Sequence, residues 1–259
     1  MPLSVPNYLV LTGIHTNDPK KRAVGNLATI AFHYLLRSGE YTFVNPNQRR
    51  RTKQFRICDV IFWKNDTILP HTLPLATLLR DVTEGTLNIS NQKNGKRAQT
   101  IHQEVTGTLP CPVHALVRQV KQILQNTNDT STIISTFYSH QYPQGRALRV
   151  GCVTRAIQKT VTILRLDRQG IRPSDVSSHS LRAGGATAMH LNGIPDSTIQ
   201  KLGRWSSDTF LIYIHEQIAA FSKGVSKQMG LRVNFKNIRR EFAPISSPEL
   251  RTAACTTQN

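Results

Sequence analysis

Residues 179–213 read HSLRAGGATAMHLNGIPDSTIQKLGRWSSDTFLIY, and this stretch decides which fold and which chemistry we expect of the chain. It begins with His179 and Arg182, whose spacing places both side chains on one face of a helical turn. Small residues follow, so we expect this helix to pack closely against a neighbour. The stretch ends at Tyr213, eight residues after Trp205. Together these residue types can supply the proton acceptor, the fixed cation and the nucleophile that break a phosphodiester.

These motifs, in this order, resemble the catalytic core of the tyrosine recombinase (phage integrase) family. The family pattern is His-x-x-Arg, then Leu-Gly-His or Leu-Gly-x-Trp, then a nucleophilic tyrosine, and it is similar to HSLR, LGRW and Tyr213. The family's upstream Arg-x-x-Glu and its hairpin lysine resemble LLRSGEYT, which contains Arg37, and ISNQKNGKRAQTI, which contains Lys93. The resemblance covers roughly residues 20–225. Within the family, the sequences of these motifs are most similar to those of the branch carried by eukaryotic mobile elements of the DIRS and Crypton kind.

The resemblance implies an α+β fold, a mainly α-helical catalytic domain with a small three-stranded antiparallel sheet. The residue patterns favour the same class. Apolar periodicity predicts helices over 21–36, 113–124, 149–164, 180–192, 196–202 and 209–221. Aromatic and β-branched residues predict a strand over 55–63, and an Asn94-Gly95 turn predicts a β-hairpin between 86–90 and 97–105. Prolines interrupt any period over 69–79, which stays ambiguous.

Three segments are expected along the chain. Residues 1–20 have no strong period and are interpreted as an N-terminal loop or the remnant of a linker. Residues 21–240 form the catalytic domain, and residues 241–259 a disordered tail. The family usually carries a separate helical DNA-binding domain before its first arginine. Because Arg37 lies too near the start for one, we expect a fragment, a mispredicted gene product or a reduced element.

The resemblance assigns catalytic roles to six side chains: Arg37, Lys93, His179, Arg182, Trp205 and Tyr213. Tyr213 would attack the scissile phosphorus, and a core tyrosine on an apolar helix is the competing interpretation. Arg37 and Arg182 would hold the two non-bridging oxygens, because a guanidinium binds them bidentately and keeps its charge. Arg37 could instead be a cation that complements a helix end. Glu40 would orient Arg37, or be an ordinary surface carboxylate.

The other roles each have an alternative within the chain. Lys93 would protonate the leaving 5′-oxygen, although Lys96 lies in the same turn and competes for this role. His179 would accept the tyrosine proton or hydrogen-bond the phosphate, and its competing interpretation is a core histidine. Counting back from the tyrosine, the family's His/Trp position falls on Arg204 without a gap and on Trp205 with one. We favour Trp205, because an indole can pack on the site and donate one hydrogen bond.

A second group of basic side chains is expected to contact the DNA backbone, with a solvated loop as the equally good alternative for those at 49–53. The group consists of Arg49, Arg50, Arg51, Lys53, Lys96, Arg97 and Arg204.

Composition agrees with a polyanionic partner. The formal charge is +18, from 33 Lys and Arg against 15 Asp and Glu. We therefore expect double-stranded DNA as the partner, with self-association on DNA, although a basic protein without specificity would have the same charge. No apolar run approaches the length of a membrane span, so no membrane partner is expected. The start lacks a basic head typical of signal peptides, which predicts a nuclear protein in a eukaryote, a cytoplasmic one otherwise, and no secretion.

The predicted function is cleavage and rejoining of DNA strands through a 3′-phosphotyrosyl intermediate, with no cofactor and no metal. One rival is a catalytically decayed DNA-binding protein derived from a mobile-element recombinase. A metal-dependent nuclease would need clustered acidic ligands, and the 15 Asp and Glu residues are dispersed. Four scattered cysteines form no CxxC pair, so a zinc site is not expected either. An RNA-binding protein would need exposed aromatic platforms, and no such motif is present.

Overall fold

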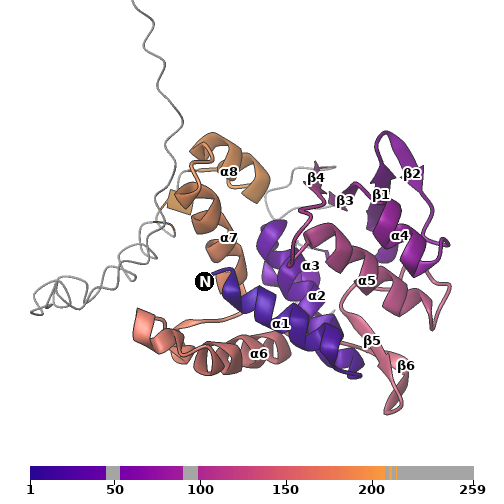
Figure 1. Ribbon diagram of the computed structural model, residues 1–259, viewed down its shortest axis with the longest axis horizontal. Coiled ribbons are helices and arrows are strands. Elements are labelled where there is room, and N and C mark those ends of the chain that lie inside the picture. The colour runs from indigo at the N-terminus through magenta and orange to yellow at the C-terminus, as the bar shows by residue number, and fades with distance from the viewer. Residues whose placement is uncertain (45–52, 90–98, 208–209, 212–213, 215–259) are drawn as a thin grey trace, which may run out of the picture. The chain divides into compact units, whose positions relative to one another are not determined.

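The computed structural model describes residues 1–44, 53–89, 99–207, 210–211 and 214, which all lie in one compact unit, Met1–Lys223 (Figure 1). The helices of this part of the chain are α1 (Ser4–His15), α2 (Pro19–His33), α3 (Ser38–Tyr41), α4 (Leu75–Asp81), α5 (Pro112–Leu124), α6 (Val150–Ile163), α7 (His179–Leu191) and α8 (Asp196–Gly203). The strands are β1 (Val60–Lys64), β2 (Thr67–Leu69), β3 (Glu84–Ile89), β4 (Gln99–Glu104), β5 (Thr136–Ser139) and β6 (Tyr142–Ala147). Short 3₁₀ turns cover Ile57–Asp59, Leu166–Gln169 and Pro173–Asp175.

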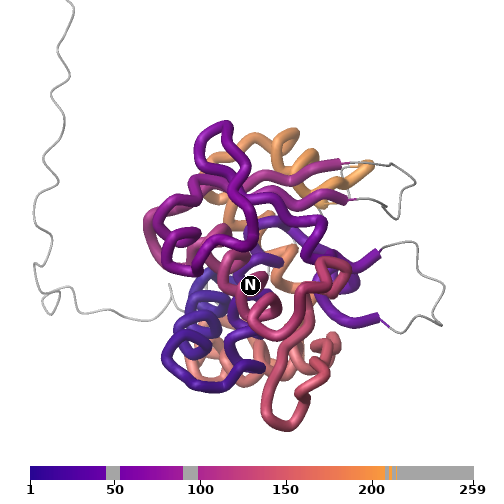
Figure 2. The backbone as a smooth tube through the Cα atoms, turned by 90° about the vertical axis from the view of Figure 1, so that its right-hand side faces the viewer, coloured from indigo at the N-terminus to yellow at the C-terminus, as the bar shows by residue number. Residues whose placement is uncertain are grey.

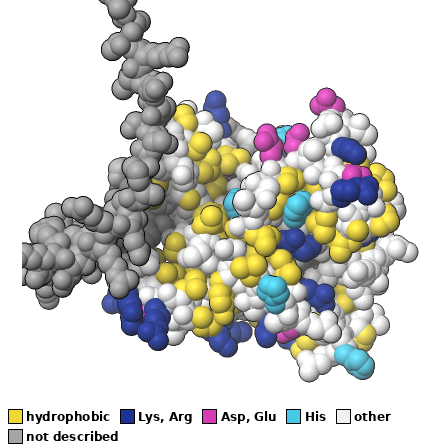
Figure 3. Space-filling model, viewed as in Figure 1, with side chains coloured by type: hydrophobic (Ala, Val, Ile, Leu, Met, Phe, Trp, Pro, Cys, Tyr) yellow, Lys and Arg dark blue, Asp and Glu magenta, His cyan; other side chains and the backbone are white. Residues whose placement is uncertain are grey.

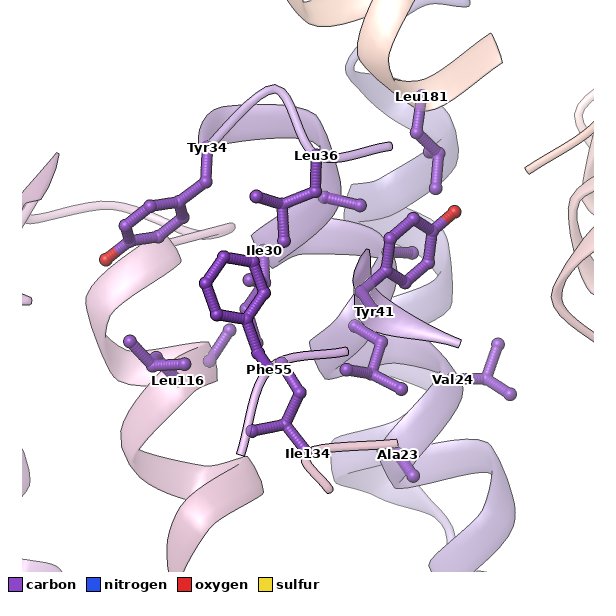
Figure 4. Packing of buried hydrophobic residues seen from close by; sticks show 14 of the residues in the cluster. Ala23, Val24, Ile30, Tyr34, Leu36, Tyr41, Phe55, Leu116, Ile134 and Leu181 are labelled. Carbon is purple, nitrogen blue, oxygen red and sulfur yellow. The ribbon is translucent and has the colours of Figure 1, made fainter. Parts of the chain in front are cut away.

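Helix α2 is the central element of the core. It begins after Asp18, whose carboxylate accepts the backbone N–H groups of Lys20 at 2.9 Å and Lys21 at 3.2 Å, and Pro19 occupies the first turn. Every residue from 23 to 32 is buried. A helix buried on all sides must be covered by several neighbours, and α1, α5 and α7 all pack on it. Figure 4 shows side chains of the α2 region meeting residues from other parts of the chain in this core.

The loop interpretation of residues 1–20 is wrong, because Ser4–His15 forms helix α1 and packs along α2. The two helices approach so closely that a Cβ atom on Gly25 would overlap the carbonyl group of Leu9. Apolar residues lie on both the buried and the exposed sides of α1, so the sequence shows no clear stripe. This is why periodicity did not reveal the helix.

The expected hairpin and strand are present in a sheet of strand order β2-β1-β3-β4, antiparallel throughout. β3 and β4 pair up to Ile89 and Gln99, and Figure 2 shows them running side by side to the point where the description stops. The expectation of three strands missed β2, which follows a turn at Asn65 in a left-handed conformation (φ 53°). The segment 55–63 begins with a 3₁₀ turn, so its strand begins only at Val60.

A second, two-stranded sheet of β5 and β6 was not predicted. The buried amide of Gln119 on α5 donates to the carbonyl oxygens of Ile134 at 2.7 Å and Thr136 at 3.2 Å, which ties this hairpin to the core. The predicted helices over 21–36, 113–124, 149–164, 180–192 and 196–202 match α2, α5, α6, α7 and α8. The predicted α+β class is therefore confirmed.

Candidate active site

The loop between α2 and α3 presents Arg37. Leu35 has a left-handed backbone (φ 49°), which turns the chain out of α2. Arg37 then caps α3: its backbone N–H donates to Glu40 Oε2 at 2.7 Å, and its Nη1 donates to Oε1 at 3.3 Å. Glu40 is 1% exposed, whereas the Arg37 side chain is 21% exposed. A buried carboxylate therefore holds an arginine that still reaches the surface.

Helix α7 presents His179 and Arg182. The residue before it, Ser178, is fixed by two partners, since Tyr41 Oη donates to its carbonyl at 2.9 Å and its N–H donates to Thr154 Oγ1 at 3.2 Å. The predicted close packing of this helix is confirmed, because a Cβ atom on Gly185 would overlap the backbone carbonyl of Phe32 on α2. The N-terminal half of α7 is thus held in place by contacts with α2, α3 and α6.

The end of α8 closes the site from a third direction. The carbonyl of Gly203 accepts a hydrogen bond from Arg182 Nη2, and the carbonyl of Arg204 accepts one from Arg37 Nη2 at 3.3 Å. The last carbonyls of a helix lack intrahelical partners and carry partial negative charge, so cations are favoured there. Arg182 Nη1 also donates to the carbonyl of Leu35. Three segments that lie far apart in the sequence therefore meet at Arg37 and Arg182.

Arg204 lies in the interior and not at the surface. It is 6% exposed and has a left-handed backbone (φ 58°, ψ 42°). Its Nη1 and Nη2 donate to the two oxygens of Glu40 at 3.2 and 3.0 Å, and Nη2 also donates to the carbonyl of Leu35 at 3.1 Å. Burial lowers the pKa of Arg204, and the Glu40 carboxylate opposes this shift. The expected contact between this side chain and a DNA backbone does not fit such a buried placement.

Trp205 covers Arg182. The guanidinium carbon of Arg182 lies 4.1 Å from the centroid of the indole, and the indole also stacks on Phe210, with 5.4 Å between ring centroids. A Cβ atom on Gly203 would overlap the Trp205 ring, so a glycine is required at this place. Of the two candidates for the His/Trp position, Trp205 is the one that contacts a predicted phosphate ligand through its side chain.

His179 lies at the surface beside these cations. Desolvation, and then the positive charges of Arg182 and Arg37, lower the pKa of His179 below its ordinary value of 6.5. The imidazole is therefore neutral at pH 7 and able to accept a proton. Arg37, Arg182, Arg204 and Glu40 together carry a formal charge of +2, three positive minus one negative. The arrangement suits an anion with two oxygens to hold, such as a phosphodiester.

Several predicted site residues lie outside the described residues: Arg49, Arg50, Arg51, Lys93, Lys96, Arg97 and Tyr213. Lys53 is described and is exposed. The neighbours of the tyrosine in the sequence, Phe210 and Ile214, are both buried in a small apolar cluster with Leu35 and Ala186. The cluster thus brings Phe210 and Ile214 together with Leu35, which lies between α2 and α3.

Two searches within the described part of the chain gave no candidates. No three or more His, Cys, Asp or Glu side chains there are grouped so as to hold a metal ion. None of the helices in the described ranges is both long and apolar enough to cross a bilayer.

Comparison with known proteins shows the family to which the chain belongs. The model of the phage integrase family matches residues 77–219, which is more than half of the chain. The chain therefore belongs to the phage integrase family. Among curated proteins, no sequence match was found.

The solved structures that are similar to this chain include the following two. One is the XerH site-specific recombinase bound to its difH substrate in a pre-cleavage complex, with a TM-score of 0.52 and 14% identity over 89% of this chain and 53% of that one. The other is the Tn1549 transposon integrase (residues 82–397) in complex with circular intermediate DNA, with a TM-score of 0.43 and 12% identity over 82% of this chain and 60% of that one. The first likeness confirms the fold of a tyrosine recombinase catalytic domain. The chain spans about half the length of XerH.

Proposed function

We propose that this protein breaks and rejoins DNA strands through a 3′-phosphotyrosyl bond formed on Tyr213. The observation that carries the proposal is the convergence of Arg37, from the loop between α2 and α3, with Arg182 and the neutral His179, both from α7. Membership of the phage integrase family supports site-specific recombination as the general process.

The first step is attack by the Tyr213 oxygen on the scissile phosphorus. A phenol has a pKa of about 10, so it needs a base and a strong electrostatic partner at neutral pH. His179 would accept the phenol proton. Arg37 and Arg182 would bind the non-bridging oxygens, which gain negative charge as phosphorus becomes five-coordinate. Their fixed charge therefore favours the transition state over the ground state.

The second step is departure of the 5′-oxygen, to which Lys93 would donate a proton. The tyrosine–phosphorus bond forms as the phosphorus–5′-oxygen bond breaks, so the phosphodiester energy is kept in the covalent intermediate. Rejoining reverses both steps, with a 5′-hydroxyl as the nucleophile and Tyr213 as the leaving group. Neither a nucleotide cofactor nor a metal enters this scheme.

The proposed partner is duplex DNA, on which copies of the chain would self-associate. The formal charge of +18 and the exposed Lys53 support a polyanionic partner. An origin in a DIRS- or Crypton-like mobile element is part of the proposal and is supported by the resemblance of the segments LLRSGEYT and LGRWSSDTFLIYI to that branch.

A second candidate is a DNA-binding protein that has lost catalysis. One observation favours it: both Nη atoms of Arg182 donate to main-chain carbonyls, of Leu35 and Gly203. Arg182 is also only 3% exposed, so an active site would have to open this guanidinium to the phosphate when DNA binds. If Arg182 stays as buried when DNA is bound, the clamp is incomplete.

Covalent trapping distinguishes the two candidates. A duplex nicked just beyond the scissile phosphate loses its 5′-hydroxyl fragment after cleavage, so the phosphotyrosyl adduct accumulates. Wild-type protein should give a slow band in denaturing electrophoresis that protease removes. Tyr213→Phe should give none, while its DNA affinity stays within about twofold, because only the nucleophilic oxygen is removed. A wild type without an adduct on any DNA, including the ends of its own element, favours the decayed protein. An adduct in Tyr213→Phe assigns the nucleophile to another residue.

A further inference from the structure

We propose that Arg204 is a positioning residue for Arg37 and acts on it through Glu40 and through its own main chain. The inference rests on the proposed function, in which Arg37 holds the scissile phosphate. It assigns the residue after Leu-Gly to the support of the phosphate clamp and not to contact with the phosphate or with DNA.

The geometry shows how two residues hold one guanidinium from both sides. Glu40 binds Arg37 at the backbone N–H (2.7 Å) and at Nη1 (3.3 Å), and the carbonyl of Arg204 binds Nη2 (3.3 Å). The carboxylate that does this is itself fixed by both Nη atoms of Arg204, at 3.2 and 3.0 Å. Arg37 is thus oriented by the carboxylate of Glu40 and the carbonyl of Arg204, and Arg204 fixes the position of both groups.

The buried charges of Glu40 and Arg204 also stabilise each other. A carboxylate that is 1% exposed is stable in its charged form only with a buried partner, and Arg204, at 6% exposed, is that partner. Arg37 is too exposed to replace it, because water screens its charge. Without Arg204, Glu40 would turn toward Arg37 and draw it inward. This change moves the guanidinium away from the place where the phosphate binds.

The number of contacts at position 204 explains why an arginine is required there. The fork of the Arg204 guanidinium reaches both oxygens of Glu40 and the carbonyl of Leu35 at the same time. That carbonyl also accepts from Arg182, so Leu35 links Arg204 to the second phosphate ligand. A lysine would keep the charge but has no fixed fork, and a neutral residue would lose both.

The test measures single-turnover adduct formation with four variants on the nicked duplex. Arg204→Met should lower the rate roughly 100-fold and Arg204→Lys roughly 10-fold, with little change in DNA affinity. Arg118→Met is the matched control, because Arg118 is a half-buried arginine bonded to Asn26 on α2 and takes no part in the site. Glu40→Gln should match Arg204→Met, and thermal unfolding should show that each variant is folded at the assay temperature.

A neutral substrate separates positioning from a structural role. When a methyl group replaces one non-bridging oxygen of the scissile phosphate, the charge that Arg37 neutralises is absent. The defect of Arg204→Met relative to wild type should then shrink to less than about fivefold, whereas Tyr213→Phe should stay inactive. A defect of equal size on both substrates, or a rate of Arg204→Met equal to that of wild type, overturns the inference.

A readout without catalysis keeps the inference independent of the proposed function. In protein labelled with ¹⁵N-arginine, the Nε–Hε signal of Arg37, assigned by its loss in Arg37→Lys, should report a rigid side chain. It should become mobile in Arg204→Met and stay rigid in Arg118→Met. If it stays rigid in Arg204→Met, the inference fails even if the wild type forms adducts. If the wild type forms none but the signal behaves as expected, only the proposed function fails.

Discussion

Arg182 is 3% exposed, donates to two main-chain carbonyls and lies against the face of an indole. These contacts orient the guanidinium without removing its charge. An arginine oriented in this way still attracts an anion, whereas a carboxylate partner would compete with it. Arg37 does contact a carboxylate, that of Glu40, but Glu40 shares both of its oxygens with Arg204, and the Nη2 of Arg37 donates to the carbonyl of Arg204.

The neutral state of His179 leads to a prediction for pH dependence. Its pKa lies below 6.5 because desolvation and two nearby cations disfavour the protonated form, so the proton-accepting form persists into more acid solution. The second-order rate constant for adduct formation should therefore rise with pH with a midpoint below 6.5. Rates measured from about pH 5 to about pH 8 would show this limb, and His179→Gln should lack it. A midpoint above 6.5 in the wild type would contradict the assignment of His179 as the proton acceptor.

At the scale of elements, the segment after α8 is held by one aromatic pair and one small cluster. Trp205 stacks on Phe210, and Phe210 and Ile214 pack with Leu35 and Ala186. Phe210 and Ile214, which we call the anchor, flank Tyr213 in the sequence, and both are buried. The cluster joins this anchor to the same loop that presents Arg37.

Phe210→Ala should therefore reduce adduct formation more than its effect on folding explains. Removing a buried phenyl ring costs about 3 kcal/mol of unfolding free energy and leaves a cavity. We expect the rate per folded molecule to fall at least about tenfold, because the Trp205 stack and the anchor are both lost. Phe62→Ala is the matched control, since Phe62 is fully buried in β1, away from the site. Equal rates for the two variants, measured after chemical denaturation has given their stabilities, would rule out the anchor.

The sequence predicted those elements whose pattern is local. Helices α2, α5 and α6 have either a cap or a clear apolar face, and the paired strands β3 and β4 flank the Asn94-Gly95 pair in the sequence. Helix α1 was missed because its apolar residues surround it, and β5–β6 because a bulge and a glycine interrupt the alternation.

The sequence predicted residues of the candidate site but not the contacts between them. The motifs pointed to Arg37, His179 and Arg182, and the structure places these three residues together. The pairing of Glu40 with Arg204 could not be read from the sequence, because charge pairing across 164 residues leaves no periodic or spacing signal. The burial of Arg204 depends on the left-handed end of α8, and a non-glycine residue in that conformation is uncommon.

For the whole molecule, charge is the dominant feature. The face shown in Figure 3 carries Lys and Arg side chains at several separate places, with apolar and uncharged side chains between them. A distributed positive charge gives affinity for a polyanion through release of counterions, without reading its sequence.

Binding to duplex DNA should accordingly weaken steeply with salt. The logarithm of the association constant should fall linearly with the logarithm of salt concentration, by about 0.9 for each phosphate contact. Lys53→Ala should make this slope shallower by about 0.9, the value for one phosphate contact. Lys53 is exposed and follows the basic residues 49–51 in the sequence. Lys20→Ala is the control, since Lys20 is an exposed lysine in the first turn of α2, at the end opposite Arg37. A slope near zero for the wild type would argue against an electrostatic interface.

The distance along the chain between Glu40 and Arg204 has a consequence for biosynthesis. During translation the ribosome releases Arg37 and Glu40 early, and the residue that completes the clamp emerges 164 positions after Glu40. A nascent or prematurely terminated polypeptide thus carries the acidic half of the pair without its basic half. An unfinished chain therefore lacks the pair that orients Arg37, because the clamp assembles only after nearly the whole domain has been synthesised.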